Sequence, residues 1–515
     1  MFEYKYNSFY EILKEHAKNI PNSTAYFIGD RKIDFYRLKM KVDTFARFLE
    51  FIGVKKGDKV ALVVANSLEF VIAFLATGRL GAVAVPINTF LKEEEIAFII
   101  NDSNAKILVA SNQFAKNTEN LLKKTPIEKI VWEGDRKDLD EDNISFQEIL
   151  SNLESHERVS YKPNIDDLAV IIYTSGTTGK PKGAMLSYKN IFANIYGVSK
   201  LMKITKKDRF IVYLPMFHSF TLTVTVLMPL FFASPVVIIR SIMPFSNIIK
   251  QTLLKKVTIF TGVPDVYNAL SKAKIPWYFH WFNKVKFYVS GAAPLSEETL
   301  KRFKKNFKKG VLLEGYGLSE ASPVVSVNLP KKQKPLSVGP AIPGVEVKIV
   351  NEEMVEVPTG EIGEIIVKGD NVMQGYLNRL DATAETIVNG WLKTGDLGKM
   401  DEDGFIYIVD RKKDLIISKG INIYPREIEE VFMKYPGIKA AAVIGAKDEK
   451  GIEVPIAYIE PEEEQEIEMN KLKKYLKENL ANFKIPKNIY KVKELPKNAT
   501  GKVLKRVLKE KVNKV

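Results

Sequence analysis

The chain has 515 residues, of which 46% are hydrophobic and 27% are charged, values typical of a soluble globular protein with more than one domain. Its net charge of +15 favours anionic partners, a group that includes nucleotides, phosphorylated cofactors, acidic proteins, membranes and nucleic acid. The lack of cysteine excludes disulfides, thiolate metal sites and a protein thiol nucleophile. The first five residues lack the apolar core of a signal peptide, so we expect a cytoplasmic protein.

Strand and helix patterns alternate through the first 314 residues. The first series predicts strands at 59–65, 82–86, 106–110 and 129–132, with helices at 68–80, from residue 93 and near 114–124. The second series predicts strands at 168–172, 210–214, 236–239, 258–260, 285–289 and 311–313, with helices between them. Such alternation is typical of mainly parallel sheets whose two faces are both covered by helices.

Residues 220–239 need separate attention because they carry no charge and are long enough to span a bilayer. Pro229 and Pro235 interrupt this run, which ends in the β-branched residues 236–239. These features favour a buried helix, a turn and a buried strand over a membrane helix.

The pattern changes from residue 338 onward. Short strands between glycines, at 345–350, 364–367 and 405–409, predict a small antiparallel barrel or distorted sheet. A compact α/β piece follows Arg411, with strands at 440–444 and 456–460 and helices at 427–434 and 470–480. Residues 471–515 carry 15 Lys and Arg against three Glu, a net charge of +12. This basic tail is either a solvated face or a dock for an anionic acceptor.

Residues 173–183, Tyr-Thr-Ser-Gly-Thr-Thr-Gly-Lys-Pro-Lys-Gly, directly follow an apolar strand. Glycines let a backbone approach a phosphate, and amide, hydroxyl and lysine groups donate hydrogen bonds to it. Pro181 after Lys180 excludes the Walker P-loop, which needs Ser or Thr there. A disordered linker is the alternative, but the preceding buried-type strand argues against it. The segment therefore predicts a loop that grips and releases a polyphosphate.

Several further motifs lie downstream. Residues 289–294 (Val-Ser-Gly-Ala-Ala-Pro) and 314–320 (Glu-Gly-Tyr-Gly-Leu-Ser-Glu) each follow a strand, where small residues leave room for a flat base. Tyr316 offers an aromatic face, and Glu320 offers an oxygen ligand for Mg²⁺. The chain then continues with Thr-Gly-Asp at 394–396, Asp-Arg-Lys-Lys-Asp at 410–414, a glycine-containing segment at 418–429, and Leu-Pro-Lys-Asn-Ala-Thr-Gly-Lys-Val at 495–503.

In this order the motifs resemble those of the adenylate-forming superfamily, which contains acyl-CoA synthetases, luciferases and peptide-synthetase adenylation domains. The resemblance implies an α/β fold. Residues 1–410 would form a large N-terminal adenylation domain with two parallel-type, helix-flanked sheets and a small β-barrel-like subdomain. Residues 411–515 would form a small mobile C-terminal α+β domain, with a hinge near Lys413.

The resemblance also implies roles for individual residues. The phosphates would be held by Thr174, Ser175, Gly176, Thr177, Thr178 and Lys182, and the adenine by Gly291, Ala292, Ala293, Gly315, Tyr316, Gly317 and Ser319. Asp396 and Arg411 would hold the ribose, Glu320 and Thr174 the Mg²⁺, and Gly420 would belong to the segment that lines the pantetheine tunnel. Lys502 and Glu320 would be catalytic. His218 would gate or position the acyl group; the alternative is a core histidine.

The implied reaction is ATP- and Mg²⁺-dependent activation of a medium- or long-chain fatty acid to acyl-AMP, followed by transfer to coenzyme A. An aliphatic acid is expected because residues 221–232 and 261–264 contain no charge that would recognise a polar substrate side chain. Acyl carrier protein is the alternative acceptor, since an acidic carrier would suit the basic tail. The sequence shows no nucleic-acid-binding motif, and it leaves peripheral contact with the inner membrane and a dimer open.

Overall fold

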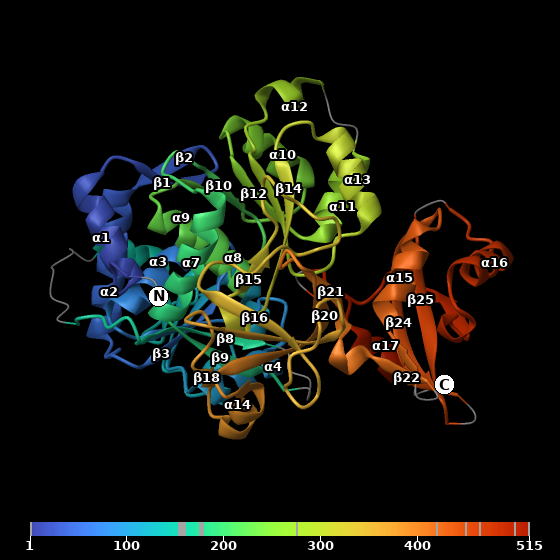
Figure 1. The fold of residues 1–515 in the computed structure, drawn as a ribbon. Helices are drawn as coiled ribbons and strands as arrows, with labels where there is room; N and C mark the ends of the chain where they lie inside the picture. The colour runs from blue at the N-terminus through green and yellow to red at the C-terminus, as the bar shows by residue number, and fades with distance from the viewer. Residues whose placement is uncertain are drawn as a thin grey trace.

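The computed structural model describes residues 3–152, 161–174, 180–273, 277–418, 421–448, 451–462, 465–498 and 501–512 (Figure 1). Its first sheet has eight strands, mostly parallel. In spatial order they are β18 (Gly375–Tyr376), β9 (Lys182–Ser187), β8 (Leu168–Thr174), β4 (Val83–Pro86), β3 (Lys59–Val63), β5 (Ile107–Ser111), β6 (Lys129–Glu133) and β7 (Asn143–Ser145). Both faces of this sheet are buried, since alternate residues of β3 enter two different hydrophobic clusters.

Most helices of this region bury one face, whereas α3 is buried on nearly all sides, and several of them begin at a side-chain cap. They are α1 (Phe9–Asn19), α2 (Phe35–Phe51), α3 (Leu68–Arg79), α4 (Glu93–Ser103), α5 (Leu121–Lys124), α6 (Phe146–Asn152) and α7 (Tyr188–Met202). Side chains of Ser8, Asp34, Ser67 and Ser187 accept hydrogen bonds from the first turns of α1, α2, α3 and α7. The single helix predicted near 114–124 is wrong: a 3₁₀ turn at Asn112–Asn117 precedes the short α5. Between them the Thr118 hydroxyl donates to the Phe114 carbonyl.

The second sheet also has eight strands. In spatial order they are β15 (Val324–Val327), β14 (Val311–Gly317), β13 (Phe287–Ser290), β12 (Ile259–Gly262), β10 (Phe210–Val212), β11 (Val236–Ile238), β1 (Thr24–Ile28) and β2 (Arg31–Asp34). Helices α10 (Phe245–Leu254), α11 (Pro264–Lys272), α12 (Trp277–Phe282) and α13 (Glu297–Asn306) cover one face. The other face shares a large core with the first sheet, so that α7 lies in the core between the two sheets. The predicted doubly covered parallel sheets are therefore confirmed.

The uncharged run folds as the sequence predicted. It forms α8 (Ser219–Thr221), a π-helix (Leu222–Leu227), α9 (Met228–Phe231) and strand β11. Within the described part of the chain, none of the helices combines the length and apolar character needed to cross a bilayer.

A third, antiparallel sheet follows. It contains β16 (Val345–Val350), β17 (Gly363–Gly369), β20 (Trp391–Met400), β19 (Ile387–Val388) and β21 (Ile406–Arg411), with α14 (Leu380–Thr386) beside it.

A 3₁₀ turn at Lys412–Asp414 connects this sheet to the last unit. That unit holds β22 (Ile416–Ser418), β23 (Ile421–Ile423), α15 (Pro425–Lys434), β24 (Ile438–Lys447), β25 (Glu453–Pro461), α16 (Met469–Asn479), β26 (Asn488–Lys491) and α17 (Lys505–Val512). Its two hydrophobic clusters contain only residues from 416 onward, and it sits beside the larger body (Figure 1).

Candidate active site

One cavity of about 1960 Å³ lies where the carboxyl ends of the second sheet meet the β8–β9 hairpin and the C-terminal unit. Most of the predicted site residues line it. They are Thr174, Lys182, His218, Gly291, Ala292, Gly315, Tyr316, Gly317, Ser319, Glu320, Arg411, Lys413 and Lys502. Ala293 and Asp396 are not among the lining residues, but Asp396 contacts two of them, Tyr316 and Arg411. Ser175, Gly176, Thr177, Thr178 and Gly420 lie outside the described residues.

The predicted metal-binding residues meet across two sheets. Thr174 ends β8 and Glu320 follows β14; the Thr174 hydroxyl donates to Glu320 Oε1 over 3.4 Å. The Tyr376 hydroxyl donates to the same oxygen over 2.8 Å. Lys182, which pairs with Thr174 in the hairpin register, stands over the Tyr376 ring at 5.2 Å. One carboxylate, two hydroxyls and a lysine therefore face one point in the cavity.

This donor set fits Mg²⁺ bound together with a polyphosphate. Magnesium favours oxygen ligands and is held by one or two carboxylates plus phosphates and water, not by a cage of protein side chains. Glu320 supplies the carboxylate, and Thr174 supplies a hydroxyl next to it. Among the described residues no group of three or more acidic or histidine side chains is placed to hold an ion without such help.

A second cluster joins the predicted adenine and ribose residues. Tyr316 donates its hydroxyl hydrogen to Asp396 Oδ2 over 2.6 Å, and Arg411 Nε lies 2.7 Å from Asp396 Oδ1. Asp396 is only 3% exposed; burial of the Tyr316 hydroxyl, and then the charge and hydrogen bond of Asp396, raise the pKa of Tyr316 well above its usual value. Three motifs separated by up to 95 residues thus form one rigid assembly.

Backbone geometry explains two of the small residues. A Cβ at Gly317 would lie 1.9 Å from the Pro323 carbonyl oxygen, so a side chain cannot fit there. Ala292 has a φ of 70°, a left-handed conformation that turns the loop after β13 into the cavity.

The 291–295 loop is tied to β14, because the buried Glu314 carboxylate accepts a hydrogen bond from the Leu295 amide. Burial raises the pKa of Glu314 to about 7.

Lys502 reaches the cavity from the C-terminal unit. Burial, together with the charge of Arg411, lowers the pKa of Lys502 to about 8. Burial and Arg411 also lower the pKa of Lys413. The cluster therefore concentrates positive charge where an anion is expected to bind, and no described carboxylate forms an ion pair with Lys502 or Lys413.

His218 begins the segment between the nucleotide groups and the uncharged run. Its Nδ1 accepts a hydrogen bond from the Phe220 amide over 3.3 Å, and burial lowers its pKa to about 4. The imidazole is therefore neutral at pH 7 and carries its hydrogen on Nε2. Next to it the hydroxyls of Ser219 and Ser319 are 2.9 Å apart, which connects this segment to the predicted adenine motif.

The cavity continues away from these polar groups into an apolar end. Its walls come from α7 and the residues after it, the π-helix, α9, the first residues of β10 and β12, and strands β13 and β15. They are Val198, Met202, Ile204, Phe210, Val224, Met228, Ile259, Val289 and Val327. None of these side chains carries a charge or a hydrogen-bonding group. Pi-helical turns are frequent at functional sites, and here the turn places Val224 in the wall.

The sequence analysis assigned no role to Tyr376 or to Glu314. Gly-Tyr at 375–376 has no local signal, since its importance comes from pairing of β18 with β9, 190 residues earlier. Glu314 adjoins the Gly-Tyr-Gly turn, but its contact with Leu295 depends on the parallel pairing of β13 with β14.

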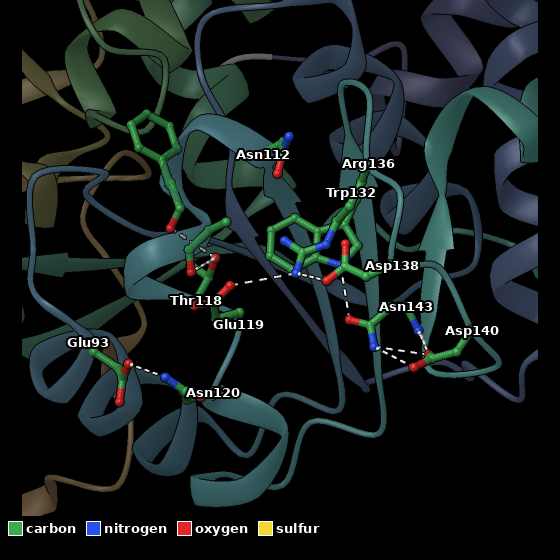
Figure 2. A network of polar contacts seen from close by, with 12 residues as sticks. Glu93, Asn112, Thr118, Glu119, Asn120, Trp132, Arg136, Asp138, Asp140 and Asn143 are labelled. Carbon is green, nitrogen blue, oxygen red and sulfur yellow. Dashed lines mark hydrogen bonds and ion pairs between the residues drawn. The ribbon is translucent and has the colours of Figure 1, made fainter.

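A dense polar network elsewhere on the first sheet does not belong to this site (Figure 2). There the Arg136 guanidinium stands 4.0 Å above the Trp132 ring and contacts Asp138 at 2.6 Å, while Trp132 Nε1 donates to Asn143. Asn143 in turn donates to Asp140. None of these residues lines the cavity, and the network ties together the edge strands β6 and β7.

Comparison with known proteins agrees with this geometry. The family model "AMP-binding enzyme" matches residues 13–377, and "AMP-binding enzyme C-terminal domain" matches 427–502. A long-chain-fatty-acid–CoA ligase of Escherichia coli O6:H1 is 32% identical, covering 98% of this chain and 95% of its own. A 2-succinylbenzoate–CoA ligase of Bacillus thuringiensis is 33% identical, covering 98% of each chain.

Among solved structures, the o-succinylbenzoate coenzyme A synthetase of Bacillus subtilis in complex with ATP and magnesium superposes with a TM-score of 0.85. The two proteins are 30% identical, and the match covers 97% of this chain and 99% of the other. Because the two family models together match most of the chain, and relatives at 32% and 33% identity cover nearly all of it, the chain belongs to the AMP-binding enzymes, the adenylate-forming superfamily.

Proposed function

We propose that this adenylate-forming enzyme is an acid–CoA ligase that activates a medium- or long-chain fatty acid with ATP and Mg²⁺ and transfers the acyl group to coenzyme A. Relatives named as CoA ligases support the general class. One observation supports the fatty acid: a single cavity joins the nucleotide residues to a long apolar end. A dicarboxylic acid would need a cation at that end, and the apolar lining supplies none.

The first step forms the bond between a carboxylate oxygen of the acid and the α-phosphorus of ATP, and it breaks the bond from that phosphorus to pyrophosphate. The reacting groups are both anions, so the site must offset their repulsion. Lys502 supplies a cation, while Lys182, Thr174 and the 175–179 loop hold the β- and γ-phosphates. Glu320 and Thr174 would hold Mg²⁺, which neutralises charge on the phosphates when bound.

The nucleoside contacts follow from the clusters described above. Tyr316 presents its ring to the adenine, in a slot bounded by the 291–293 loop, Gly315, Gly317 and Ser319. Asp396 and Arg411 take the ribose hydroxyls. Because Tyr316 already bonds Asp396, adenine stacking and ribose binding are coupled.

In the second step the sulfur of coenzyme A bonds to the acyl carbon, the acyl–phosphate oxygen bond breaks, AMP leaves, and the thiol proton passes to solvent. The neutral His218 positions the acyl group at the junction, and the segment around Gly420 lines the thiol path. Residues 411–515 would turn on a hinge at Lys413 to exchange Lys502 for this segment. The 3₁₀ turn at Lys412–Asp414, between the third sheet and the last unit, supports that position for the hinge.

The test is a paired acceptor assay. Saturated fatty acids of graded length are supplied with ATP and Mg²⁺, with coenzyme A in one series and acyl carrier protein in the other. We expect acyl-CoA and AMP with medium or long acids, and little product with 2-succinylbenzoate or ferulate. Product with carrier protein alone would replace the proposed acceptor. A preference for an aromatic acid would overturn the proposed substrate while leaving adenylation intact.

A further inference from the structure

The parallel strands of the second sheet all begin on the side of the sheet opposite the active site. These amino-terminal strand ends together form one edge of the sheet. Here four connections lie side by side: the Thr258 amide donates to the Arg209 carbonyl, the Lys286 amide to the Thr258 carbonyl, and the Val311 amide to the Lys286 carbonyl, over 2.7–2.9 Å. The nucleotide residues stand at the other ends of the same strands. A partner bound at this edge would therefore leave the ATP site open.

This edge is strongly basic. We name it the basic edge and define it by the cations on the four connections: Lys203, Lys206, Lys207, Arg209, Lys255, Lys256, Lys284, Lys286, Lys308 and Lys309. The connections themselves, residues 203–209, 254–258, 277–286 and 307–310, contain one acidic residue, Asp208, which is buried and paired with Lys286 at 2.6 Å. Lys284, Lys308 and Lys309 are exposed and form no ion pair with any residue that the structure describes. Their charges are thus available to an anionic partner.

Helix α12 adds an aromatic surface to the basic edge. Phe279 anchors the helix: it is 2% exposed, and its ring centroid lies 5.6 Å from that of Phe307. Trp281 and Phe282, by contrast, are 73% and 62% exposed. Figure 1 shows α12 at the outer end of this lobe, next to α10. The Phe279–Phe307 contact places Lys308 and Lys309 close to α12.

We propose that the basic edge and α12 form a docking surface for a bilayer that contains anionic lipid. Trp and Tyr rings prefer the boundary between headgroups and acyl chains, and nearby lysines are attracted to anionic headgroups. A nucleic acid or an acidic protein would also satisfy the lysines. The largely exposed apolar rings of Trp281 and Phe282, and Leu254 at 61% exposure on the neighbouring connection, gain most from a lipid surface.

The experiment is co-sedimentation of the full-length protein with phosphatidylcholine vesicles, with and without phosphatidylglycerol, over a range of salt concentrations. We expect binding that requires phosphatidylglycerol and weakens with salt. The double variant Lys308→Gln/Lys309→Gln should lower the partition coefficient by about 30-fold, since each lysine near an anionic surface contributes on the order of 1 kcal/mol. Trp281→Ser/Phe282→Ser should lower it by about tenfold or more.

Matched controls separate this surface from general charge and hydrophobicity. Lys473→Gln/Lys474→Gln removes two exposed lysines of α16, and Phe51→Ser removes an 87% exposed ring at the end of α2. Both controls should bind vesicles as the unmodified protein does. ATP–pyrophosphate exchange with a soluble short acid should be unchanged in all variants, which shows that they are folded. Equal loss in the controls, absence of vesicle binding, or binding to duplex DNA or acyl carrier protein instead would each overturn the proposal.

Discussion

At the scale of single residues, the surroundings of Lys502 oppose the charge that its proposed role requires. In the proposed adenylation the lysine must carry a positive charge to assist the approach of two anions, yet burial and Arg411 favour its neutral form and lower its pKa to about 8. ATP binding adds negative charge and would favour the cation again. The free enzyme therefore loses its competent form at a lower pH than the ATP complex does.

This argument predicts the pH dependence of adenylation. The kcat/KM for ATP in pyrophosphate exchange should be level well below pH 8, bend near pH 8 and fall about tenfold per pH unit well above it, because only protonated Lys502 is competent. At saturating ATP the fall should move to higher pH. His218, whose pKa is lowered to about 4, should contribute no change between pH 6 and 8.

The Lys502→Ala variant is the control for this pH profile. It should nearly abolish adenylation and lose the alkaline fall, yet spare thioester formation from supplied acyl adenylate. The Glu314→Gln variant removes the other buried group whose pKa lies near neutrality, and it shows whether Glu314 contributes to the pH profile. An alkaline fall that persists in Lys502→Ala would assign the titration to another residue.

At the scale of elements, strand length sets the size of the apolar end. Gly262, the last residue of β12, accepts a hydrogen bond from Gly291 in the predicted adenine loop, whereas Ile259 begins the strand. Four residues at about 3.3 Å each make this wall about 13 Å long. Met202, the last residue of α7, and Phe210, the first residue of β10, also line the cavity, and the strand direction leads us to infer that they close its end away from the predicted adenine loop.

Substitution of Met202 should therefore change the preferred chain length. Met202→Ala is expected to move the optimum to longer acids, and Met202→Trp to lower kcat/KM for the longest acids by about tenfold or more, because the cavity end is opened or filled. The KM for ATP should stay constant. Initial rates over a series of saturated acids measure both effects.

Met216→Ala provides the comparison for loss of buried volume alone. Met216 is 1% exposed and does not line the cavity. This variant should lose stability but keep the length profile. If Met202 and Met216 variants changed the profile equally, the apolar end would not be the acyl site.

At the scale of the whole molecule, two ion pairs join the C-terminal unit to α11. Lys497 lies 2.8 Å from Asp265, and Lys272 pairs with Glu462. Asp265 is also next to Gly501, directly before Lys502, since a Cβ built on Gly501 would lie 3.2 Å from its carboxylate. These contacts hold Lys502 in the cavity, and a turn of the C-terminal unit would have to break them.

Removing both pairs should weaken adenylation modestly. Exposed ion pairs contribute about 0.2–1 kcal/mol each, so Asp265→Asn/Lys272→Gln should slow pyrophosphate exchange by up to about 30-fold without slowing thioester formation from supplied acyl adenylate. Lys348→Gln, which removes a pair with Glu356 in the third sheet, is the control and should change neither rate. Equal slowing of both half-reactions would contradict a role in domain placement.

Much of the fold and of the site can be predicted from short stretches of the sequence. Hydrophobic periodicity predicted the βαβ series, the helix–turn–strand reading of residues 220–239 and the C-terminal α/β unit, because these depend on neighbours in the chain. The motif order likewise picked out residues that mostly line one cavity, while their nucleotide-binding and catalytic roles stay predictions. The helix near 114–124 failed because hydroxyl and amide side chains there bond the backbone and compete with helix formation.

Only the tertiary structure decided which distant segments meet. It adds the N-terminal hairpin β1–β2 to the second sheet through pairing of Tyr26 with Val236, brings Tyr376 to Glu320, and places Lys308 beside α12. No local pattern encodes such partners, since the free energy that selects them comes from burying complementary surfaces across the whole chain. The sequence by itself determined the chemical groups and their family, and packing determined the cavity in which those groups converge.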